Sequence, residues 1–330
     1  MKNVPFLSSR RLGLACVMAA VAAVLPLQAS AQAYPAKPVK VLVGFTAGGA
    51  VDLIARSVGQ AMQAGLGQPI VVENKPGAGT NIAMKALIDA PPDGYTLMLT
   101  ANSIAANPAL YKPAPFDPEK DVAPVALVGR VPVVIAANAA SPYTSVAQLI
   151  QAAKGKPNTI AYGSPGNGAT PHMAMEFFTR AAGVDLQHIP YKGGSQAITD
   201  AIGGQIPLVA VNALEVLPHV KSGKLRVIAV LSPNRSSIYP DVPTIAESGF
   251  PGFEASVWYG FIAPAATPKA VVERLHAEVE KALQNPEVRA RLANAGGEVL
   301  PGTTEQFAAL IRAERQRYEK LVREANIKPD

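Results

Sequence analysis

Short apolar runs alternate with segments of helical periodicity along most of the chain, the pattern of an α/β protein whose sheets are covered by helices. The final segment shows the helical spacing, because its apolar residues fall on one face at Phe307, Leu310, Ile311, Tyr318, Leu321 and Val322. Helix starts are expected at Thr267-Pro268, at Asn285-Pro286, and at Thr303 with Gln306 as a capping box. Ten strands are expected, at Val39–Phe45, Ile70–Glu73, Thr96–Thr100, Val125–Val128, Val133–Ala137, Thr159–Tyr162, Leu186–Ile189, Leu208–Val211, Leu225–Leu231 and Val257–Ala263.

The N-terminus has the features of a secretory signal peptide. Three basic residues precede an apolar run over 12–27, which is shorter than the roughly 20 residues that span a bilayer. Ala31-Gln32-Ala33 fits a small-x-small cleavage site, with Ala29-Ser30-Ala31 as the alternative. We therefore expect residues 1–33 to be cleaved near Ala33 and the mature protein to reside in the periplasm. Arg10-Arg11 leaves both general and twin-arginine export open.

Composition excludes several classes of function for the mature chain. Cys16, the only cysteine, lies in the signal segment, so no thiol remains as a nucleophile, a metal ligand or a disulfide partner. Removal of 1–33 leaves 27 basic and 24 acidic residues, a net charge of +3 with no basic run interleaved with aromatics. A nucleic-acid partner is therefore not expected. The four histidines lack His-x-x-x-His spacing, and we expect neither a metal nor a cofactor.

The mature chain is long for a single hydrophobic core, which favours two lobes. Crossings between them are expected near Ala137–Pro142 and near Gly249–Phe253. Lobe 1 would comprise 34–136 and 254–330, and lobe 2 would comprise 137–253. Two crossings of this kind suit closure about a hinge.

Two glycine-rich turns carry the candidate chemistry. In the first, the strand ending at Phe45 runs through Thr46-Ala47-Gly48-Gly49 into a helix that Asp52 can cap. Unpartnered N–H groups and the helix dipole make such a turn an anion site. It lacks both Gly-Lys-Ser/Thr and Gly-x-Gly-x-x-Gly, so a carboxylate is favoured over a phosphate or a dinucleotide.

The second turn repeats this arrangement at Ser164–Thr170, with Thr170 as the expected N-cap and Pro171 at the first helical position. If the turns lie on opposite lobes, each can hold one end of a two-ended anion through main-chain amides. Residues ending other parallel strands join the same cleft. The candidate ligand-binding residues are Phe45, Thr46, Ala47, Gly48, Gly49, Asp52, Thr100, Asn102, Ser164, Gly166, Asn167, Gly168, Thr170 and Asn212.

The chain resembles the substrate-binding receptors of tripartite tricarboxylate transporters, the Bug family, over essentially its whole mature length. The resemblance runs through Gly48-Gly49-x-x-Asp52, Val72-Glu73-Asn74-Lys75-Pro76-Gly77-Ala78-Gly79, Pro92-Asp93-Gly94-Tyr95, His188-Ile189-Pro190-Tyr191-Lys192-Gly193, Gly223-Lys224-Leu225-Arg226 and Trp258-Tyr259-Gly260. It implies a two-lobed periplasmic binding protein of the type II kind that delivers a small di- or tricarboxylate to integral-membrane transporter subunits. We expect the protein to be a monomer. The resemblance also implies that the two turns hold the two ends of the ligand, the first partly through water.

Two departures from the family bear on the ligand. Thr46-Ala47 replaces a proline-containing pair of many members, which adds a hydroxyl to the first turn. Many members carry Asp where this chain has Asn212, and an acid there could pair with the ammonium group of an amino-acid ligand. The sequence therefore predicts that an amino dicarboxylate such as glutamate is not the preferred ligand.

Two other functions share this sequence pattern. A liganded receptor could inform a membrane histidine kinase instead of a permease. A hydrolase is less well supported, because Gly193-Gly194-Ser195-Gln196-Ala197 departs from Gly-x-Ser-x-Gly at its last residue. His172, in the first turn of a helix, fits a packing or capping role better than catalysis. We expect a binding protein that performs no chemistry.

Overall fold

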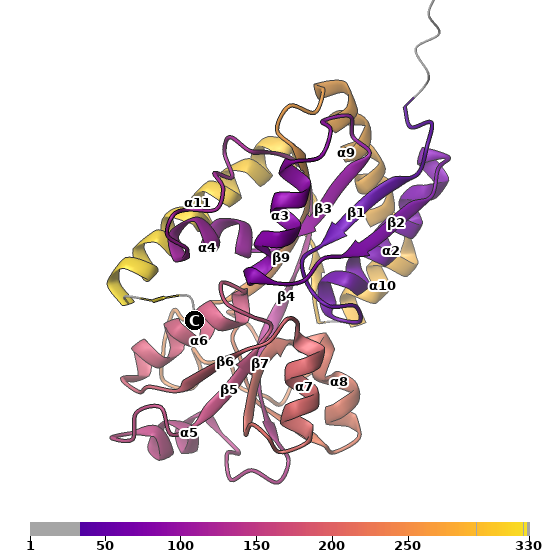
Figure 1. The fold of residues 1–330 in the computed structure, drawn as a ribbon. Coiled ribbons are helices and arrows are strands. Elements are labelled where there is room, and N and C mark those ends of the chain that lie inside the picture. Colours follow the sequence, from indigo (N-terminus) through magenta and orange to yellow (C-terminus); the bar gives the residue numbers. More distant parts are fainter. Residues whose placement is uncertain (1–33, 295, 326, 329–330) are drawn as a thin grey trace, which may run out of the picture. The chain divides into compact units, whose positions relative to one another are not determined.

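The computed structural model describes residues 34–294, 296–325 and 327–328, and the predicted signal peptide lies outside these ranges. Residues 37–330 belong to one structural unit, shown in Figure 1. Its strands are β1 (Val39–Val43), β2 (Ile70–Asn74), β3 (Thr96–Thr100), β4 (Val122–Asn138), β5 (Ala161–Ser164), β6 (Gln187–Pro190), β7 (Leu208–Asn212), β8 (Leu225–Val230), β9 (Ser256–Pro264) and β10 (Glu298–Val299). Its helices are α2 (Ala50–Leu66), η1 (Ala78–Thr80), α3 (Asn81–Ile88), α4 (Ser103–Leu110), α5 (Val146–Ala153), α6 (Thr170–Ala182), α7 (Gly194–Ile202), α8 (Ala213–Lys221), α9 (Lys269–Gln284), α10 (Pro286–Asn294) and α11 (Thr304–Ala325).

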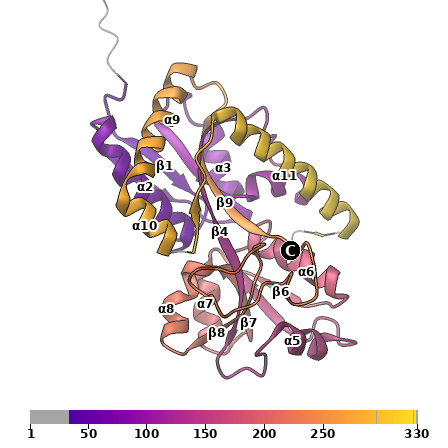
Figure 2. The same ribbon diagram turned by 180° about the vertical axis from the view of Figure 1, so that it is seen from behind.

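The long strand β4 joins two sections of sheet. In the first section, residues 122–132 of β4 pair with β9, in the order β2-β1-β3-β9-β4, and β10 pairs with the other edge of β4. In the second section, residues 133–138 pair with β7 and β8, and the sheet continues through β5 to β6. Figure 2 shows β4 running unbroken from one section into the other. The prediction of separate strands at 125–128 and 133–137 was therefore wrong.

The reason for this error lies in how β4 accommodates its prolines. Pro124 lies at a shift of register against β9, and Pro132 is the last residue of β4 that pairs with β9. Prolines are tolerated in strands at such irregularities, because a missing N–H then breaks no ladder bond. The change of sheet section falls between Pro132 and Val133, inside a strand and before the loop where we expected the crossing.

Each section has its own apolar core under a layer of helices. Helices α2, α9 and α10 cover one face of the first section and α3, α4 and α11 cover the other (Figures 1 and 2). Its core includes Leu42, Trp258 and Phe307, with the last two rings edge to face at 5.5 Å between centroids. The core of the second section includes Val209 and Val227. The burial of these side chains is the main stabilising term of each section.

The expected helix starts are mostly confirmed. Helix α10 begins at Pro286, and Thr303 and Gln306 form the reciprocal capping box, with N···O distances of 2.9 and 3.2 Å. The prediction that Thr170 is the N-cap of α6 was wrong. The helix already begins at Thr170, and Ala169 is the N-cap. The Thr170 hydroxyl is consequently not used to cap the helix.

Strand register brings the two glycine-rich turns together. Strands β1, β2 and β3 are parallel to one another, as are β5, β6 and β7. The carboxyl ends of each set of strands therefore lie on the same side of its section. The last residue of β3, Thr100, lies opposite Gly260 of β9, and Gly260 lies opposite Leu127 of β4. The last residue of β7, Asn212, lies opposite Val133 of β4. Both sets of strand ends therefore point to the stretch of β4 where it changes section.

Candidate functional site

The first turn, between β1 and α2, is held by a buried carboxylate. Asp52 accepts hydrogen bonds from the backbone N–H of Gly48 at 3.0 Å, from Arg56 Nε at 3.0 and 3.1 Å, and from Asn74 Nδ2 at 3.0 Å. Burial alone would raise the pKa of Asp52, but these hydrogen bonds outweigh it and hold that pKa below its ordinary value. The charge of Asp52 is thus committed to fixing the turn.

The second turn, between β5 and α6, is held by a serine and a histidine. Ser164 Oγ accepts from the N–H of Gly166 at 3.1 Å and lies 2.7 Å from His188 Nε2. His172 Nδ1 accepts from the N–H of Gly168 at 3.2 Å, which confirms its capping and packing role. Gly166 and Gly168 have φ values of +132° and +73°, where a side chain would be strained.

The imidazoles of His172 and His188 stack with 4.0 Å between ring centroids. Burial lowers the pKa of His188 to about 4. Burial, followed by the proximity of His188, holds the pKa of His172 well below its ordinary value. Two neutral rings can stack behind the turn at neutral pH, and protonation of both would place like charges in contact.

These contacts correct one part of the sequence-based expectation. We expected both turns to offer free amides to an anion, but the protein's own side chains already accept from the N–H groups of Gly48, Gly166 and Gly168. The turns are preorganised by these bonds. Fewer donors are therefore left to a ligand.

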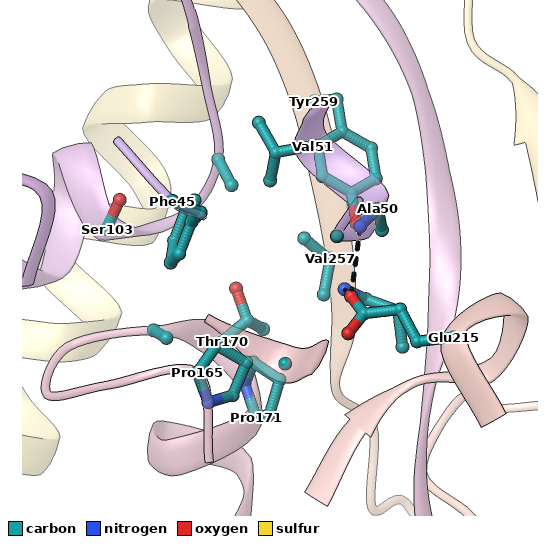
Figure 3. Close-up of a pocket in the computed structure, with 15 residues that line it drawn as sticks. Phe45, Ala50, Val51, Ser103, Pro165, Thr170, Pro171, Glu215, Val257 and Tyr259 are labelled. Atoms are coloured by element: carbon teal, nitrogen blue, oxygen red, sulfur yellow. Dashed lines mark hydrogen bonds between the residues drawn. The ribbon is translucent and has the colours of Figure 1, made fainter. Parts of the chain in front are cut away.

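A small cavity of about 20 Å³ lies where the two turns meet (Figure 3). The first section supplies lining residues from the β1 turn, α2, the end of β3 and β9. The second section supplies them from the β5 turn, α6, α7 and the end of β7. The lining residues are Phe45, Gly49, Ala50, Val51, Ala101, Ser103, Pro165, Ala169, Thr170, Pro171, Gly194, Asn212, Glu215, Val257 and Tyr259. A space of this volume holds about one water molecule.

Four residues that line the cavity each carry a buried polar atom with no hydrogen-bond partner among the described residues. These atoms are Thr170 Oγ1, Asn212 Oδ1, Glu215 Oε2 and Tyr259 OH. Buried polar atoms in proteins are nearly always paired, so four in one small cavity point to a polar ligand group. The Thr170 hydroxyl points into the space between the two sets of residues in Figure 3.

Glu215 is a cavity-lining residue that sequence reasoning missed. Its Oε1 accepts from the N–H of Ala50, the first residue of α2, at 3.1 Å, and from Asn212 Nδ2 at 2.8 Å (Figure 3). Burial raises the pKa of Glu215, and the bonds from Asn212 and Ala50 offset this only in part. A carboxylate of the second section thus reaches the helix N-terminus of the first. The signal available in the sequence was Asn212-x-x-Glu215, which spans the first turn of α8.

The buried carboxylate also bears on the prediction about amino dicarboxylates. That prediction rested on the inability of Asn212 to supply a negative charge. The structure places the Glu215 carboxylate 2.8 Å from the Asn212 amide, so an acid lies beside this position, and the ligand preference stays a prediction.

Other contacts join the two sections around the cavity. The N–H of Thr46 donates to the carbonyl of Lys192 at 3.2 Å, and Thr46 Oγ1 lies 3.4 Å from Ser195 Oγ. A Cβ added at Gly193 would lie 2.1 Å from Thr46 Oγ1, and one at Gly79 would lie 2.4 Å from the carbonyl oxygen of Asn167. Glycines therefore permit the close approach of the sections on both sides.

Of the candidate ligand-binding residues, four line the cavity: Phe45, Gly49, Thr170 and Asn212. Eight others belong to the two turns and their supports, without lining it: Thr46, Ala47, Gly48, Asp52, Ser164, Gly166, Asn167 and Gly168. The Thr100 hydroxyl donates to the carbonyl of Ala101. Asn102 connects the start of β9 to α11, accepting from the N–H of Trp258 and donating to Glu314.

In the described part of the chain, no group of three or more His, Cys, Asp or Glu side chains is placed to hold a metal ion. Nor does any described helix combine the length and apolar character needed to cross a membrane.

The fold is that of periplasmic binding proteins. The structure of the periplasmic binding protein BugD superposes with a TM-score of 0.86 at 34% sequence identity, covering 90% of this chain and 100% of BugD. Another neighbour, described as a periplasmic transporter, has a TM-score of 0.86 at 41% identity, with 90% and 100% coverage. The predicted α/β periplasmic binding protein fold is confirmed.

Residues 54–327 match the model of the tripartite tricarboxylate transporter family receptor, and the chain belongs to this family. BugT of Bordetella pertussis is 36% identical over 301 residues, which cover 91% of this chain and 92% of BugT. R. palustris Rpa4515, solved with adipate, has a TM-score of 0.85 at 32% identity, with 90% and 100% coverage. MatC from Rhodopseudomonas palustris, with bound malate, has a TM-score of 0.84 at 31% identity, with 88% and 100% coverage. The resemblance seen in the sequence is thereby confirmed.

Proposed function

We propose that this protein captures a small di- or tricarboxylate between two lobes and delivers it to the membrane subunits of a tripartite tricarboxylate-type transporter. It acts as a monomer in the periplasm after cleavage of the signal peptide near Ala33. The observation that carries the proposal is the cavity between the two turns, where four buried polar atoms lack a partner among the described residues. Membership of the receptor family and relatives solved with adipate and malate support a carboxylate as the ligand.

The proposed lobes are 34–136 with 254–330, and 137–253. The change of partners within β4 at Pro132–Val133 supports a boundary close to the first of these limits. The start of β9 at Ser256 supports the second. The hinge would then lie in a continuous strand beside the start of β9, which can flex while each core stays intact.

The proposed ligand-binding residues fall into two groups. Phe45, Gly49, Thr170 and Asn212 contact the ligand. The remaining candidates hold the turns and strand ends in position: Thr46, Ala47, Gly48, Asp52, Thr100, Asn102, Ser164, Gly166, Asn167 and Gly168. Hydrogen bonds to charged ligand oxygens contribute roughly 1.5–3 kcal/mol each, so a few such donors account for useful affinity.

Ligand binding requires movement of the lobes. A cavity of about 20 Å³ is far smaller than an acid of four to six carbons. The lobes must therefore separate to admit the ligand and close over an expanded cavity. Because the ligand touches both lobes, it favours one closed arrangement, which the transporter can recognise.

A thermal-shift screen of the mature protein against a library of di- and tricarboxylates tests this function. A bound ligand raises the apparent Tm by mass action, by an amount set by its concentration relative to Kd. The fully methylated ester of each acid is the matched control, since it keeps the carbon skeleton and loses every carboxylate charge. We expect at least one acid to raise Tm and its ester to have no effect. A library in which no acid acts, or in which acid and ester act equally, would contradict the proposal.

A further inference from the structure

The orientation of the Glu215 carboxylate has consequences for ligand choice. Oε1 is occupied by the N–H of Ala50 and by the amide nitrogen of Asn212. Oε2 is buried on the cavity wall and has no hydrogen-bond partner among the described residues. Oε2 packs against the backbone of Gly194, which also lines the cavity, so this unpartnered oxygen lies at the cavity's edge.

Asn212 presents an acceptor to the same space. Its Nδ2 donates to Glu215 Oε1, which fixes the orientation of the amide and leaves Oδ1 buried without a partner. Asn212 is 5% exposed, so solvent does not satisfy this oxygen. Two acceptors, an amide oxygen and a carboxylate oxygen, thus belong to one wall of the cavity.

The other two unpartnered atoms are hydroxyls, of Thr170 and Tyr259. The Thr170 hydroxyl can donate to a ligand carboxylate, whereas the pKa of Tyr259 is raised by burial and by the nearby Glu215 carboxylate. The free oxygens of Asn212 and Glu215 differ from these hydroxyls, because they can only accept hydrogen bonds. They repel the oxygens of a ligand carboxylate and require a hydrogen-bond donor on the ligand. No ion pair to Glu215 is formed within the described part of the chain, where its two partners are neutral. A buried carboxylate without a cation is costly, and a donor supplied by the ligand lowers that cost.

We propose that Glu215 is a specificity-determining residue: the preferred ligand carries a hydroxyl or ammonium group beside one carboxylate, and that group donates to Glu215 Oε2 and Asn212 Oδ1. The proposal rests on the proposed function, because it concerns the same cavity. In this arrangement Asn212 and Glu215 accept hydrogen bonds from the ligand's hydroxyl or ammonium group. The carboxylates of the ligand are bound by protein hydroxyls and by the N-termini of helices.

The test is calorimetry of the mature protein with matched ligand triads that differ in one substituent. The triads are succinate, malate and aspartate; glutarate, 2-hydroxyglutarate and glutamate; and adipate, 2-hydroxyadipate and 2-aminoadipate. In the triad of the right length, we expect the hydroxy or amino acid to bind about tenfold or more tightly than the unsubstituted acid. The better member of the pair identifies the donor.

Variants at Glu215 and at a control glutamate test whether Glu215 causes the preference for the hydroxy or amino acid. In E215Q the preference for the substituted acid should fall at least severalfold, while the unsubstituted acid still binds, which shows that the pocket is intact. The matched control is E287Q, because Glu287 also lies in the first turn of a helix but on the exposed side of α10. It should retain the wild-type preference.

The outcomes separate the two proposals. Carboxylates that bind without preference, or a preference that survives in E215Q, would overturn the role of Glu215 and leave the receptor function standing. Failure of every acid in all three triads to bind wild-type protein would overturn the role of Glu215, and the receptor function would fall with it only if the whole library of di- and tricarboxylates also failed.

Discussion

The carboxylate of Glu215 on α8 accepts a hydrogen bond from the N–H of Ala50 at the start of α2, at 3.1 Å. The two residues are 165 positions apart and belong to different sheet sections. A helix N-terminus favours a negative group, since its first N–H groups lack intrahelical acceptors and lie at the positive end of the dipole. Glu215 thus takes one of the donors that we had assigned to the ligand, and the contact joins the sections beside the cavity.

Replacement of Glu215 by Gln should stabilise the protein at neutral pH in the absence of ligand. Burial raises the pKa of this carboxyl above its ordinary value of 4.5. The folded protein therefore binds the proton of Glu215 more tightly than the unfolded chain does. This difference adds to the free energy of unfolding below pH 4.5, and the contribution is lost as pH rises through the raised pKa. E215Q removes that loss, so its Tm should exceed that of wild type by a few degrees at pH 7.

Differential scanning calorimetry at pH 7 and pH 4 checks this expectation. The difference between wild type and E215Q should shrink at the lower pH, where the glutamate is protonated. An E215Q protein that is less stable than wild type at pH 7, with no change of the difference at pH 4, would show that the charged form is favoured by its surroundings.

The hydroxyl of Thr170 should matter for ligand binding and not for folding. It is buried on the cavity wall without a partner among the described residues, so T170V removes no hydrogen bond within the described chain. We expect an unchanged or slightly higher Tm and a Kd for the carboxylate that is roughly tenfold weaker. T267V is the matched control, since Thr267 Oγ1 is also buried without such a partner but lies outside the cavity lining. Equal affinity of the two variants, measured by calorimetry, would remove Thr170 from the site.

Closure of the lobes should be blocked by a methyl group at Gly193. This residue has a φ of 164°, an extended conformation open to alanine, but the added Cβ would lie 2.1 Å from Thr46 Oγ1 across the gap. Overpacking of this kind costs about 1–3 kcal/mol, so G193A should bind ligand roughly 5- to 150-fold more weakly. G203A at the other end of α7 is the control, because its Cβ would make only ordinary contacts. If G193A binds as tightly as G203A, closure does not bring Gly193 and Thr46 together.

Asp52 should contribute more to stability than an exposed aspartate in a similar ion pair. D52N weakens the bonds to Arg56, Asn74 and the N–H of Gly48, and should lower the free energy of unfolding by about 1–2 kcal/mol. The control is D89N, because Asp89 also forms an i,i+4 pair, with Lys85, but is exposed. Its effect should be within about 0.5 kcal/mol in urea denaturation. Equal effects of the two substitutions would indicate that the first turn does not depend on Asp52.

Local features of the sequence predicted most of the strands and the two turns, because apolar alternation and glycine placement act over a few residues. Thr170 and Asn212 were identified in this way. Glu215 was not, since its importance comes from a contact with Ala50 that only the folded register of β4, β7 and β9 creates. The continuity of β4 was also missed, because Pro132 normally marks the end of a strand and is tolerated here by the change of partners.

The amide groups of the turns show a second limit of sequence reasoning. Glycine-rich turns expose N–H groups in general, but which of them remain free depends on side chains that fold back on the turn. Ser164 and His172 satisfy two of them here, and neither contact follows from residue spacing alone.

The most direct test is a crystal structure of the mature protein with the carboxylate that gives the largest thermal shift. We expect the ligand in the cavity between the two turns, in contact with Phe45 and the start of α2 on one side and with Thr170 and Asn212 on the other. A ligand bound elsewhere, or one that contacts residues of a single sheet section, would contradict capture between two lobes.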